Sequence, residues 1–129
     1  MQQTRDDRYF GSDLNKFINE KCTKEMSCIN IDCVIFKKSI KKLIIIESKY
    51  PDEKIKYQQI FLLKMLYWIF YFAKKAGNNK LSKWDFNVWI VRGKPPYETA
   101  NIIHPITNKT YTLNQSELIE WLEFRKELI

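Results

Sequence analysis

The chain has 129 residues, of which 45% are hydrophobic, 15% are aromatic and 29% are charged. This composition excludes a disordered tail or a low-complexity linker and predicts one globular domain over residues 1–129. Lys and Arg outnumber Asp and Glu by 22 to 15, and the net charge of +7 favours polyanionic partners such as DNA. The charge therefore indicates a class of partner, but it does not indicate any chemistry.

Cysteine usage and hydropathy bear on the cellular compartment. The three cysteines lack the CxxC spacing, and the amino-terminal residues contain no apolar run typical of a secretory signal. We therefore expect a reducing, cytoplasmic environment. The most apolar stretch, residues 60–73, contains Lys64 and is shorter than the roughly 20 residues that span a bilayer. We expect it to form a buried helix, with no membrane partner.

The amino-terminal half of the chain predicts a helix followed by a hairpin. Ser12 can cap a helix that runs to about Lys24, with apolar residues at helical spacing. Residues 29–36 and 43–50 are rich in β-branched and apolar side chains, which predicts two strands. The lysine-rich residues between them predict a basic turn.

The carboxyl-terminal half predicts two helices and two strands. Proline and acids at 51–53 suit a first helical turn, and Gly77 supplies a stop for a long helix. In chain order, we expect a helix over 51–76, a strand over 84–92, a short edge strand over 110–113, and an amphipathic helix capped by Asn114 or Ser116.

Two charges interrupt the second apolar strand. Residues two apart on a strand point to the same face, so Glu47 and Lys49 project together. If the hairpin turns between Ser39 and Ile40, the numbers of paired residues sum to 79. That register places Asp32 opposite Glu47. Two carboxylates about 5 Å apart at the Cβ level can hold one hard cation such as Mg²⁺, beside which Lys49 can stabilise charge on a phosphate. The pattern predicts a site for phosphodiester hydrolysis.

A structural interpretation of the same residues is the alternative. Acid-x-Lys triplets arise by chance in a chain rich in both charges, and a second triplet runs from Asp52 to Lys54. In this interpretation, Glu47 and Lys49 lie at a solvated strand end and bind nothing. The additional acid in register, Asp32, favours the metal site.

The arrangement resembles the PD-(D/E)XK nuclease superfamily, in which an Asp on one strand and a Glu-x-Lys on the next form a magnesium site. The matching residues are Asp32, Glu47 and Lys49, and the resemblance extends over most of the chain, from Gly11 to Arg92. It implies an α/β fold with a mixed central β-sheet flanked by helices, a restriction-endonuclease-like core, in the order α-β-β-α-β-(β)-α. It also implies a DNA endonuclease that uses Mg²⁺, with Mn²⁺ as a substitute.

The resemblance also implies a role for a glutamine. Many members carry one early in the helix that follows the motif, and this chain has Gln58 and Gln59 there. Gln59 belongs to a stripe at helical spacing that faces the core, so we prefer it as the fourth site residue. The stripe consists of Ile55, Gln59, Leu62, Leu66, Ile69 and Ala73.

In many members, the first helix supplies a further acid to the metal. Asp13 and Glu20 are the candidates for this additional acid, and the sequence does not choose between them. The chain also resembles archaeal-type Holliday junction resolvases in size and in the Gly-Ser start of this helix, but their acidic position corresponds to Asn15. The resemblance to the superfamily is therefore stronger than the resemblance to this subfamily.

Basic and aromatic residues suggest two kinds of partner. Arg92 and Lys94 follow the third predicted strand, and Lys37 and Lys38 belong to the basic turn, where we expect contacts with DNA phosphates or, alternatively, plain solvated charge. The helix over 60–73 is apolar nearly all round and must be covered, which favours a homodimer.

The remaining residues indicate no further chemistry. His104 precedes a proline and is expected in a surface loop, and the cysteines lack metal-ligand spacing. Two alternatives to a nuclease remain: a catalytically silent nucleic-acid- or protein-binding module on the same fold, and a structural dimerisation domain. Lys49 beside Glu47 favours the nuclease, because a pure binding module does not need this pair.

Overall fold

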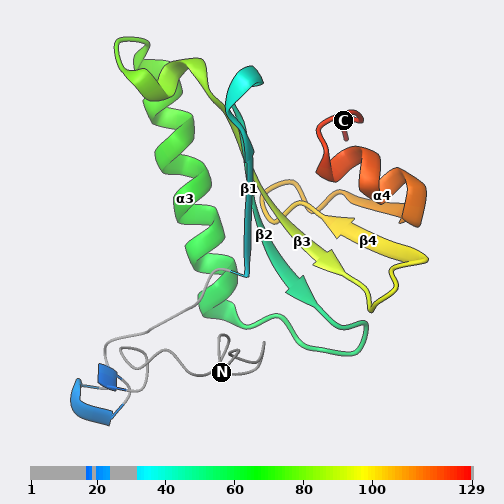
Figure 1. Ribbon diagram of the computed structural model, residues 1–129. Coiled ribbons are helices and arrows are strands. Elements are labelled where there is room, and N and C mark those ends of the chain that lie inside the picture. Colours follow the sequence, from blue (N-terminus) through cyan, green and yellow to red (C-terminus); the bar gives the residue numbers. More distant parts are fainter. Residues whose placement is uncertain (1–16, 19, 24–31, 129) are drawn as a thin grey trace, which may run out of the picture.

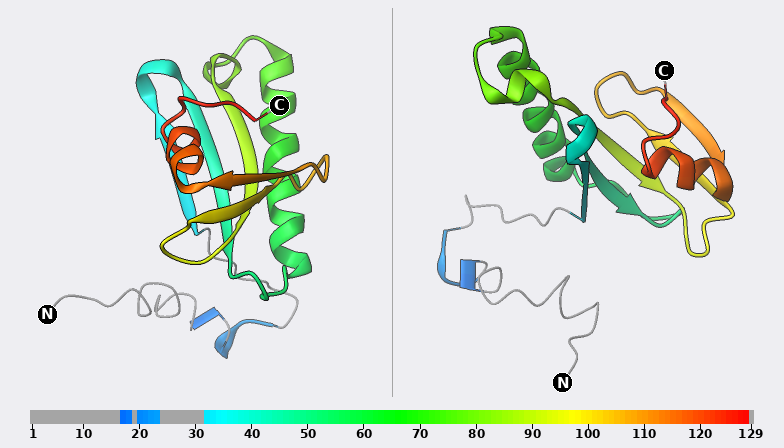
Figure 2. Two further views of the ribbon diagram at one scale, coloured as in Figure 1. Left: turned by 90° about the vertical axis from the view of Figure 1, so that its right-hand side faces the viewer. Right: turned by 45° about the horizontal axis from the view of Figure 1, so that its top comes forward.

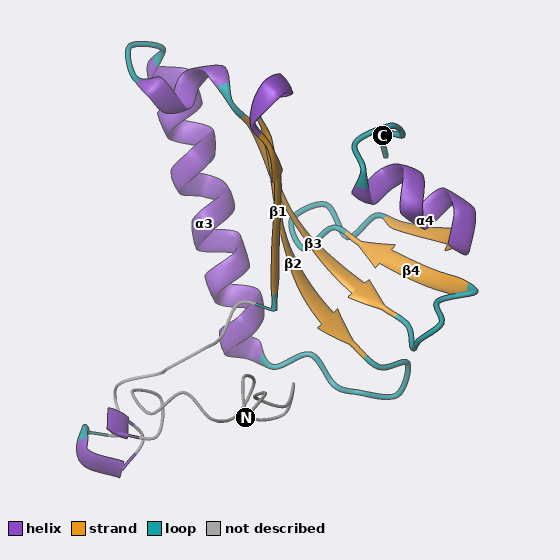
Figure 3. Ribbon diagram, in the orientation of Figure 1, coloured by secondary structure: helices purple, strands orange, loops and turns teal. Residues whose placement is uncertain are grey.

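The computed structural model describes residues 17–18, 20–23 and 32–128, which form an α/β fold around a mixed five-stranded sheet (Figure 1). The strands lie in the order of the sequence: β1 (Cys33–Lys37), β2 (Lys42–Lys49), β3 (Asp85–Arg92), β4 (Thr99–Ile103) and β5 (Thr110–Asn114). The helices are α3 (Tyr57–Ala76) and α4 (Gln115–Leu122), with 3-10 turns η1 (Lys38–Ile40) and η2 (Lys80–Lys83). Figure 3 shows the same view coloured by secondary structure.

The hairpin of β1 and β2 has the predicted register. Cys33 pairs with Ile46 and Lys37 with Lys42, so the numbers of the paired residues sum to 79. The basic turn is η1, and it is closed by Lys41 in the left-handed conformation with φ of 53°. The pairing confirms the register from which the site was predicted.

The connection from β2 to β3 explains the long helix. These strands are parallel, so the chain must cross over between them, and α3 provides this crossover on one face of the sheet. Both strands are central and buried on both faces, which is why their sequences are almost continuously apolar. Their carboxyl ends, at Lys49 and Arg92, meet at one edge of the sheet.

The two faces of the sheet carry separate cores. Under α3, the buried side chains are those of Ile45, Leu63, Val88 and Ile90. The larger core on the other face brings Trp121 and Leu118 of α4 against side chains of β2, β3 and β4. Figure 2 shows β4 and β5 running across β1–β3, which curls this part of the sheet around α4.

The segment after β3 corrects the predicted order of elements. We expect one short strand there, but two are present, because Thr99–Ile103 forms β4 between β3 and β5. Only Ala100 and Ile102 of this strand are fully buried, so the alternation is too short to identify from the sequence. The prediction for His104 is wrong in the same region, because its side chain is buried with 6% exposed.

The start of α3 also differs from the prediction. The helix begins at Tyr57, and residues 51–53 form a turn instead, in which the Glu53 carboxylate accepts a hydrogen bond from the Tyr50 N–H at 3.0 Å. Leu63 is the buried residue of the helix, whereas Ile69 of the predicted stripe is 54% exposed. The core-facing side of α3 is therefore rotated relative to the predicted stripe.

The remaining helices agree with the sequence where they are described. Asn114 caps α4 by accepting a hydrogen bond from the Glu117 N–H at 2.8 Å, which selects it over Ser116. Part of the first predicted helix is helical at residues 17–18 and 20–21, and most of the rest of it lies outside the described residues. No helix within the described part of the chain is both long enough and apolar enough to cross a bilayer.

Candidate active site

Glu47 and Lys49 lie together beneath α3 at the carboxyl end of β2. The ammonium group of Lys49 is 3.4 Å from Oε1 of Glu47, and the two residues are only 5% and 4% exposed, respectively. The interpretation that they lie at a solvated strand end is therefore wrong. Burying a carboxylate and an ammonium group is costly unless both are paired and hydrogen-bonded. We therefore expect further partners of these two side chains nearby.

Asp32 adds a second carboxylate to this pair. It precedes β1 by one residue, and continuing the observed register places it opposite Glu47 on the same face of the sheet. Its Oδ2 accepts a hydrogen bond from the Ser48 N–H at 2.8 Å, which ties the carboxylate to the backbone of β2. The structure thus brings the two acids of the predicted site together.

Gln59 reaches the same carboxylate from α3. Its Nε2 donates a hydrogen bond to Oε1 of Glu47 at 2.5 Å, while its Oε1 accepts one from the Lys56 N–H at the helix start. Gln59 therefore stabilises the first turn of α3 and also orients the Glu47 carboxylate. The choice of Gln59 over Gln58 agrees with this geometry.

Glu53 is a neighbour of the site that the sequence analysis missed. Its Oε2 is 3.4 Å from the Lys49 ammonium group, and its other oxygen accepts the Tyr50 N–H. The turn at 51–53 positions it, whereas in the predicted helix it would have pointed elsewhere. The signal was present in the sequence as an acid four residues after Lys49 and two residues after a proline.

The environment of the site raises the pKa of Glu47 to about 7, from an ordinary value of 4.5. Burial is the main cause, and the Asp32 carboxylate adds to it, while Lys49 opposes both. The pKa of Glu53 is lowered instead, mainly by the hydrogen bond from the Tyr50 backbone. Near neutral pH, the Glu47 side chain is therefore present in both its protonated and its ionised form.

The donor set suits a hard divalent cation. Asp32, Glu47 and Glu53 carry three negative charges against the single positive charge of Lys49, and carboxylate oxygens are the ligands that Mg²⁺ prefers. Mg²⁺ is usually held by one or two carboxylates together with waters, and Asp32 with Glu47 supply that number. Within the described residues, no group of three or more His, Cys, Asp or Glu side chains is arranged to hold a metal.

The other predicted residues have different positions. The Arg92 guanidinium donates hydrogen bonds to the carbonyl oxygens of Pro51 and Glu53, at 3.0 and 2.7 Å, so it fastens the turn beside the site. Lys94 and the turn residues Lys37 and Lys38 are exposed.

Of the two candidates for an additional acid, only Glu20 lies within the described residues, and it is not brought to the site there. Glu20 is exposed on a helical segment, and no contact joins it to the carboxylates within the described residues. Asp13 lies outside the described residues. The described part of the site therefore rests on Asp32, Glu47, Lys49 and Gln59, with Glu53 beside them.

Comparisons with protein-family models, with curated proteins and with solved structures find no match to this chain. The geometry of the site is therefore the basis for assigning a function.

Proposed function

We propose that the chain is a metal-dependent nuclease that hydrolyses phosphodiester bonds in DNA, with a restriction-endonuclease-like core of the PD-(D/E)XK type and a cytoplasmic location. The observation that carries this proposal is a buried cluster of side chains at one edge of the sheet, in which Glu47 lies beside Asp32, Lys49 and Gln59. Each of these side chains has a place in a hydrolytic site.

Asp32 and Glu47 would hold Mg²⁺, or Mn²⁺ as a substitute. The bound ion would act as a Lewis acid on the phosphate and lower the pKa of a water. Glu47 must lose its proton to bind a cation, and a pKa of about 7 lets it do so near neutral pH. Gln59 keeps the Glu47 carboxylate in one orientation through its hydrogen bond.

Lys49 is the catalytic cation of the proposal. Its ammonium group lies 3.4 Å from the nearest oxygens of both Glu47 and Glu53, which fix it at the rim of the carboxylate pair. There it can orient a water for attack or stabilise the charge that develops on a phosphate oxygen. Arg92 and Glu53 act as positioning residues, because they hold the turn that borders Lys49.

The substrate class follows from the charge of the whole chain. A net charge of +7 attracts nucleic acid, and the exposed Lys37, Lys38 and Lys94 are available to contact phosphates. Such contacts set affinity rather than sequence specificity, and they weaken as salt is added.

The test is DNA cleavage by the full chain with Mg²⁺ or with EDTA. We expect Glu47→Ala and Lys49→Ala to abolish cleavage while circular dichroism shows that both variants stay folded. Asp52→Ala and Lys54→Ala are the matched controls, because they alter the other acid-x-Lys triplet, which is exposed, and they should cleave like the wild type. Full activity in both site variants would refute the assignment.

A silent binding module on the same fold is the second candidate. The observation that favours it is that two carboxylates already neutralise Lys49. A module of this kind would bind DNA with the same salt dependence but would show no cleavage with Mg²⁺ or Mn²⁺ at any pH. The cleavage experiment therefore separates the two functions, whereas a binding experiment does not.

We also propose that the protein forms a homodimer through α3. Large apolar side chains on the outer surface of this helix are exposed over most of its length. The proposed interface consists of Tyr57, Phe61, Met65, Trp68 and Ile69. A contiguous apolar surface of this kind is uncommon on a monomer and typically marks an interface.

A further inference from the structure

A cavity of about 350 Å³ lies at the end of the sheet opposite to the carboxylate site. It borders Lys42 and Asp85 at the amino ends of β2 and β3, whereas Lys49 lies at the carboxyl end of β2. The length of β2 separates the two ends by about 23 Å, at roughly 3.3 Å per residue. The volume is within the range of small-molecule sites, and this site is distinct from the proposed catalytic one.

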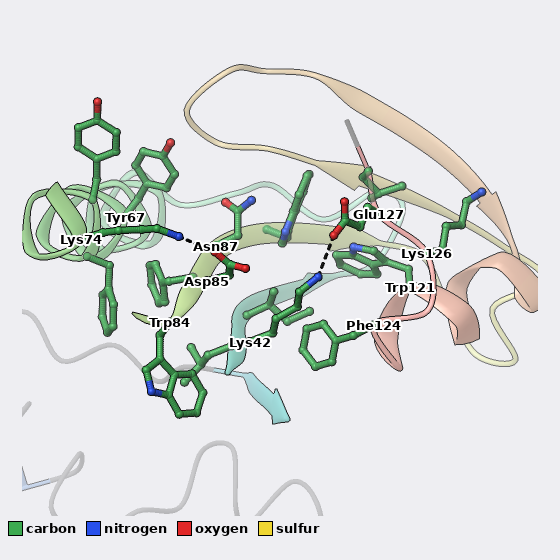
Figure 4. A pocket seen from close by; sticks show the side chains of 17 residues that line it. Lys42, Tyr67, Lys74, Trp84, Asp85, Asn87, Trp121, Phe124, Lys126 and Glu127 are labelled. Atoms are coloured by element: carbon green, nitrogen blue, oxygen red, sulfur yellow. Dashed lines mark hydrogen bonds and ion pairs between the residues drawn. The ribbon is translucent and has the colours of Figure 1, made fainter. Parts of the chain in front are cut away.

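Aromatic rings form the walls of the cavity. Tyr67 of α3 lies on one side, and Trp121 and Phe124 lie on the other (Figure 4). Tyr71 of α3 also lines the cavity, and its ring is 17° from parallel to that of Tyr67. Trp89 of β3 packs edge-on against Trp121 at a centroid distance of 5.7 Å. Tyr71 remains 38% exposed, and the flexible Lys75 side chain, whose ammonium group lies 5.3 Å from the Tyr71 ring centroid, can move to admit a stacked ligand.

A chain of hydrogen bonds fixes one polar group between these walls. The N–H groups of Ile106 and Thr107 donate to Nδ1 of His104, so the ring proton is on Nε2. Nε2 lies 2.6 Å from Oδ1 of Asn87, which also accepts the Val88 N–H at 3.0 Å. Burial lowers the pKa of His104 and thereby keeps this neutral form. Both bonds hold Oδ1 of Asn87, and its amide orientation is therefore fixed.

The Nδ2 group of Asn87 is left as a free donor. It makes no hydrogen bond with the described residues, yet no buried side-chain nitrogen or oxygen among them lacks a partner. The group is therefore accessible to solvent, and Asn87 lines the cavity between α3 and the carboxyl-terminal segment (Figure 4). A fixed donor between aromatic walls selects a flat ligand with a hydrogen-bond acceptor at its edge.

The rim of the cavity is charged but nearly balanced. Lys74 pairs with Asp85 and Lys42 pairs with Glu127, and Lys126 adds a third ammonium group (Figure 4). Exposed pairs of this kind are weak and can exchange partners. Lys126 itself lies 3.8 Å from a carboxylate oxygen of Glu117, so each of the three lysines has a carboxylate partner. Such a rim tolerates a phosphate when a pair opens, but it does not form a dedicated phosphate site.

We propose that this cavity binds a nucleobase, stacked against the Tyr71 side of the aromatic walls and hydrogen-bonded by the Asn87 amide. The net charge of +7 brings nucleic acid to the protein, and base–aromatic stacking is the usual means of holding an unpaired base. The base belongs either to a free nucleotide or to a single strand. Base binding requires neither metal nor cleavage, so the inference does not depend on the proposed nuclease function.

The test is a titration of the full chain in EDTA, followed by tryptophan fluorescence and calorimetry. The probes are the four deoxynucleoside monophosphates, the matching nucleosides, inorganic phosphate, single-stranded oligonucleotides and duplex DNA. We expect Asn87→Asp, which keeps the acceptor for His104, to weaken base binding about tenfold. Tyr71→Leu should weaken it to a similar extent, by about tenfold, through loss of stacking.

Two matched variants serve as controls. Asn101→Asp makes the same chemical change at a β4 amide whose Oδ1 accepts a hydrogen bond from Thr112, and Phe72→Leu removes a neighbouring exposed ring from α3. Both should bind like the wild type.

Each outcome of this titration either supports or overturns the proposal. Sensitivity to Asn87→Asp with nucleosides and nucleotides supports the proposal with a free nucleotide as ligand. The same sensitivity with single strands alone supports it with an unpaired base as ligand. Inorganic phosphate binding as tightly as the nucleotides, binding that neither variant changes, or no binding of any probe overturns it. Tyr71→Leu, at an exposed position, keeps the test valid if Asn87→Asp does not fold.

Discussion

The pKa of Glu47 makes a prediction about stability that needs no substrate. A carboxyl group with a pKa of 4.5 when exposed and about 7 when folded binds its proton more tightly in the folded state. The stabilisation that this protonated carboxyl group gives the folded state is complete below pH 4.5 and is lost as the pH rises through 7. The free energy of unfolding should therefore fall over this interval because a buried carboxylate becomes charged.

The size of the effect follows from the same values. At about 1.4 kcal/mol per pKa unit, the interval between 4.5 and about 7 corresponds to a loss of about 3 kcal/mol. Glu47 is buried, so solvent screening does not reduce this figure. The figure is already net of the opposing attraction of Lys49, which lowers the same pKa. Glu47→Gln removes the titration and should be more stable than the wild type above neutral pH.

The assay is urea unfolding of both proteins in EDTA, monitored by tryptophan fluorescence, from about pH 5 to about pH 8. Because other groups of the protein titrate as well, the difference between the two proteins is the quantity of interest. We expect this difference to grow with pH by about 3 kcal/mol. Asp32→Asn should give an intermediate profile, because Asp32 is the second cause of the raised pKa. Parallel profiles for the wild type and Glu47→Gln would refute the reasoning.

Four further predictions concern the cap of α4, the turn beside the site, the basic turn and the outer surface of α3. Asn114→Ala should lower the free energy of unfolding by about 1 kcal/mol in urea, whereas Ser116→Ala should not. Arg92→Gln should lower stability by about 2 kcal/mol, as expected for lost charge-assisted hydrogen bonds, and leave the salt dependence of DNA binding unchanged. Lys38→Ala should instead reduce the salt slope by about one without affecting stability. Phe61→Asp should convert a dimer to a monomer in light scattering, and a wild-type monomer would contradict the homodimer.

The hairpin shows how much of the site could be predicted from the sequence. Both strands are apolar and the turn between them is short, so only one register buries their residues, and the pairing of Cys33 with Ile46 confirms it. Once the register is known, the positions of Asp32 and Glu47 follow from the strand period alone. Local rules thus suffice where the partners are close in the sequence.

The missed features depend on contacts between distant segments. Strand β4 is defined by pairing with β3 and β5, and His104 is buried because Tyr67 and Trp89 pack edge-on against it. Glu53 reaches Lys49 because Arg92, far along the chain, holds the turn at 51–53 in a non-helical form. Propensity favoured a helix at 51–53, and this tertiary contact overrides it.

The cost of the buried cluster is itself an argument about function. Apolar side chains of similar volume in place of Glu47 and Lys49 would keep the core packed and, in comparable cases, would be neutral or more stable by about 1–4 kcal/mol. Asp32 adds a like charge that raises the pKa of Glu47 further, while its own carboxylate accepts a hydrogen bond from the Ser48 N–H. A structural ion pair gains nothing from this second acid. A divalent cation would turn the repulsion between the two carboxylates into affinity, so the pairing of acids that costs the fold stability is the one that a metal-dependent site requires.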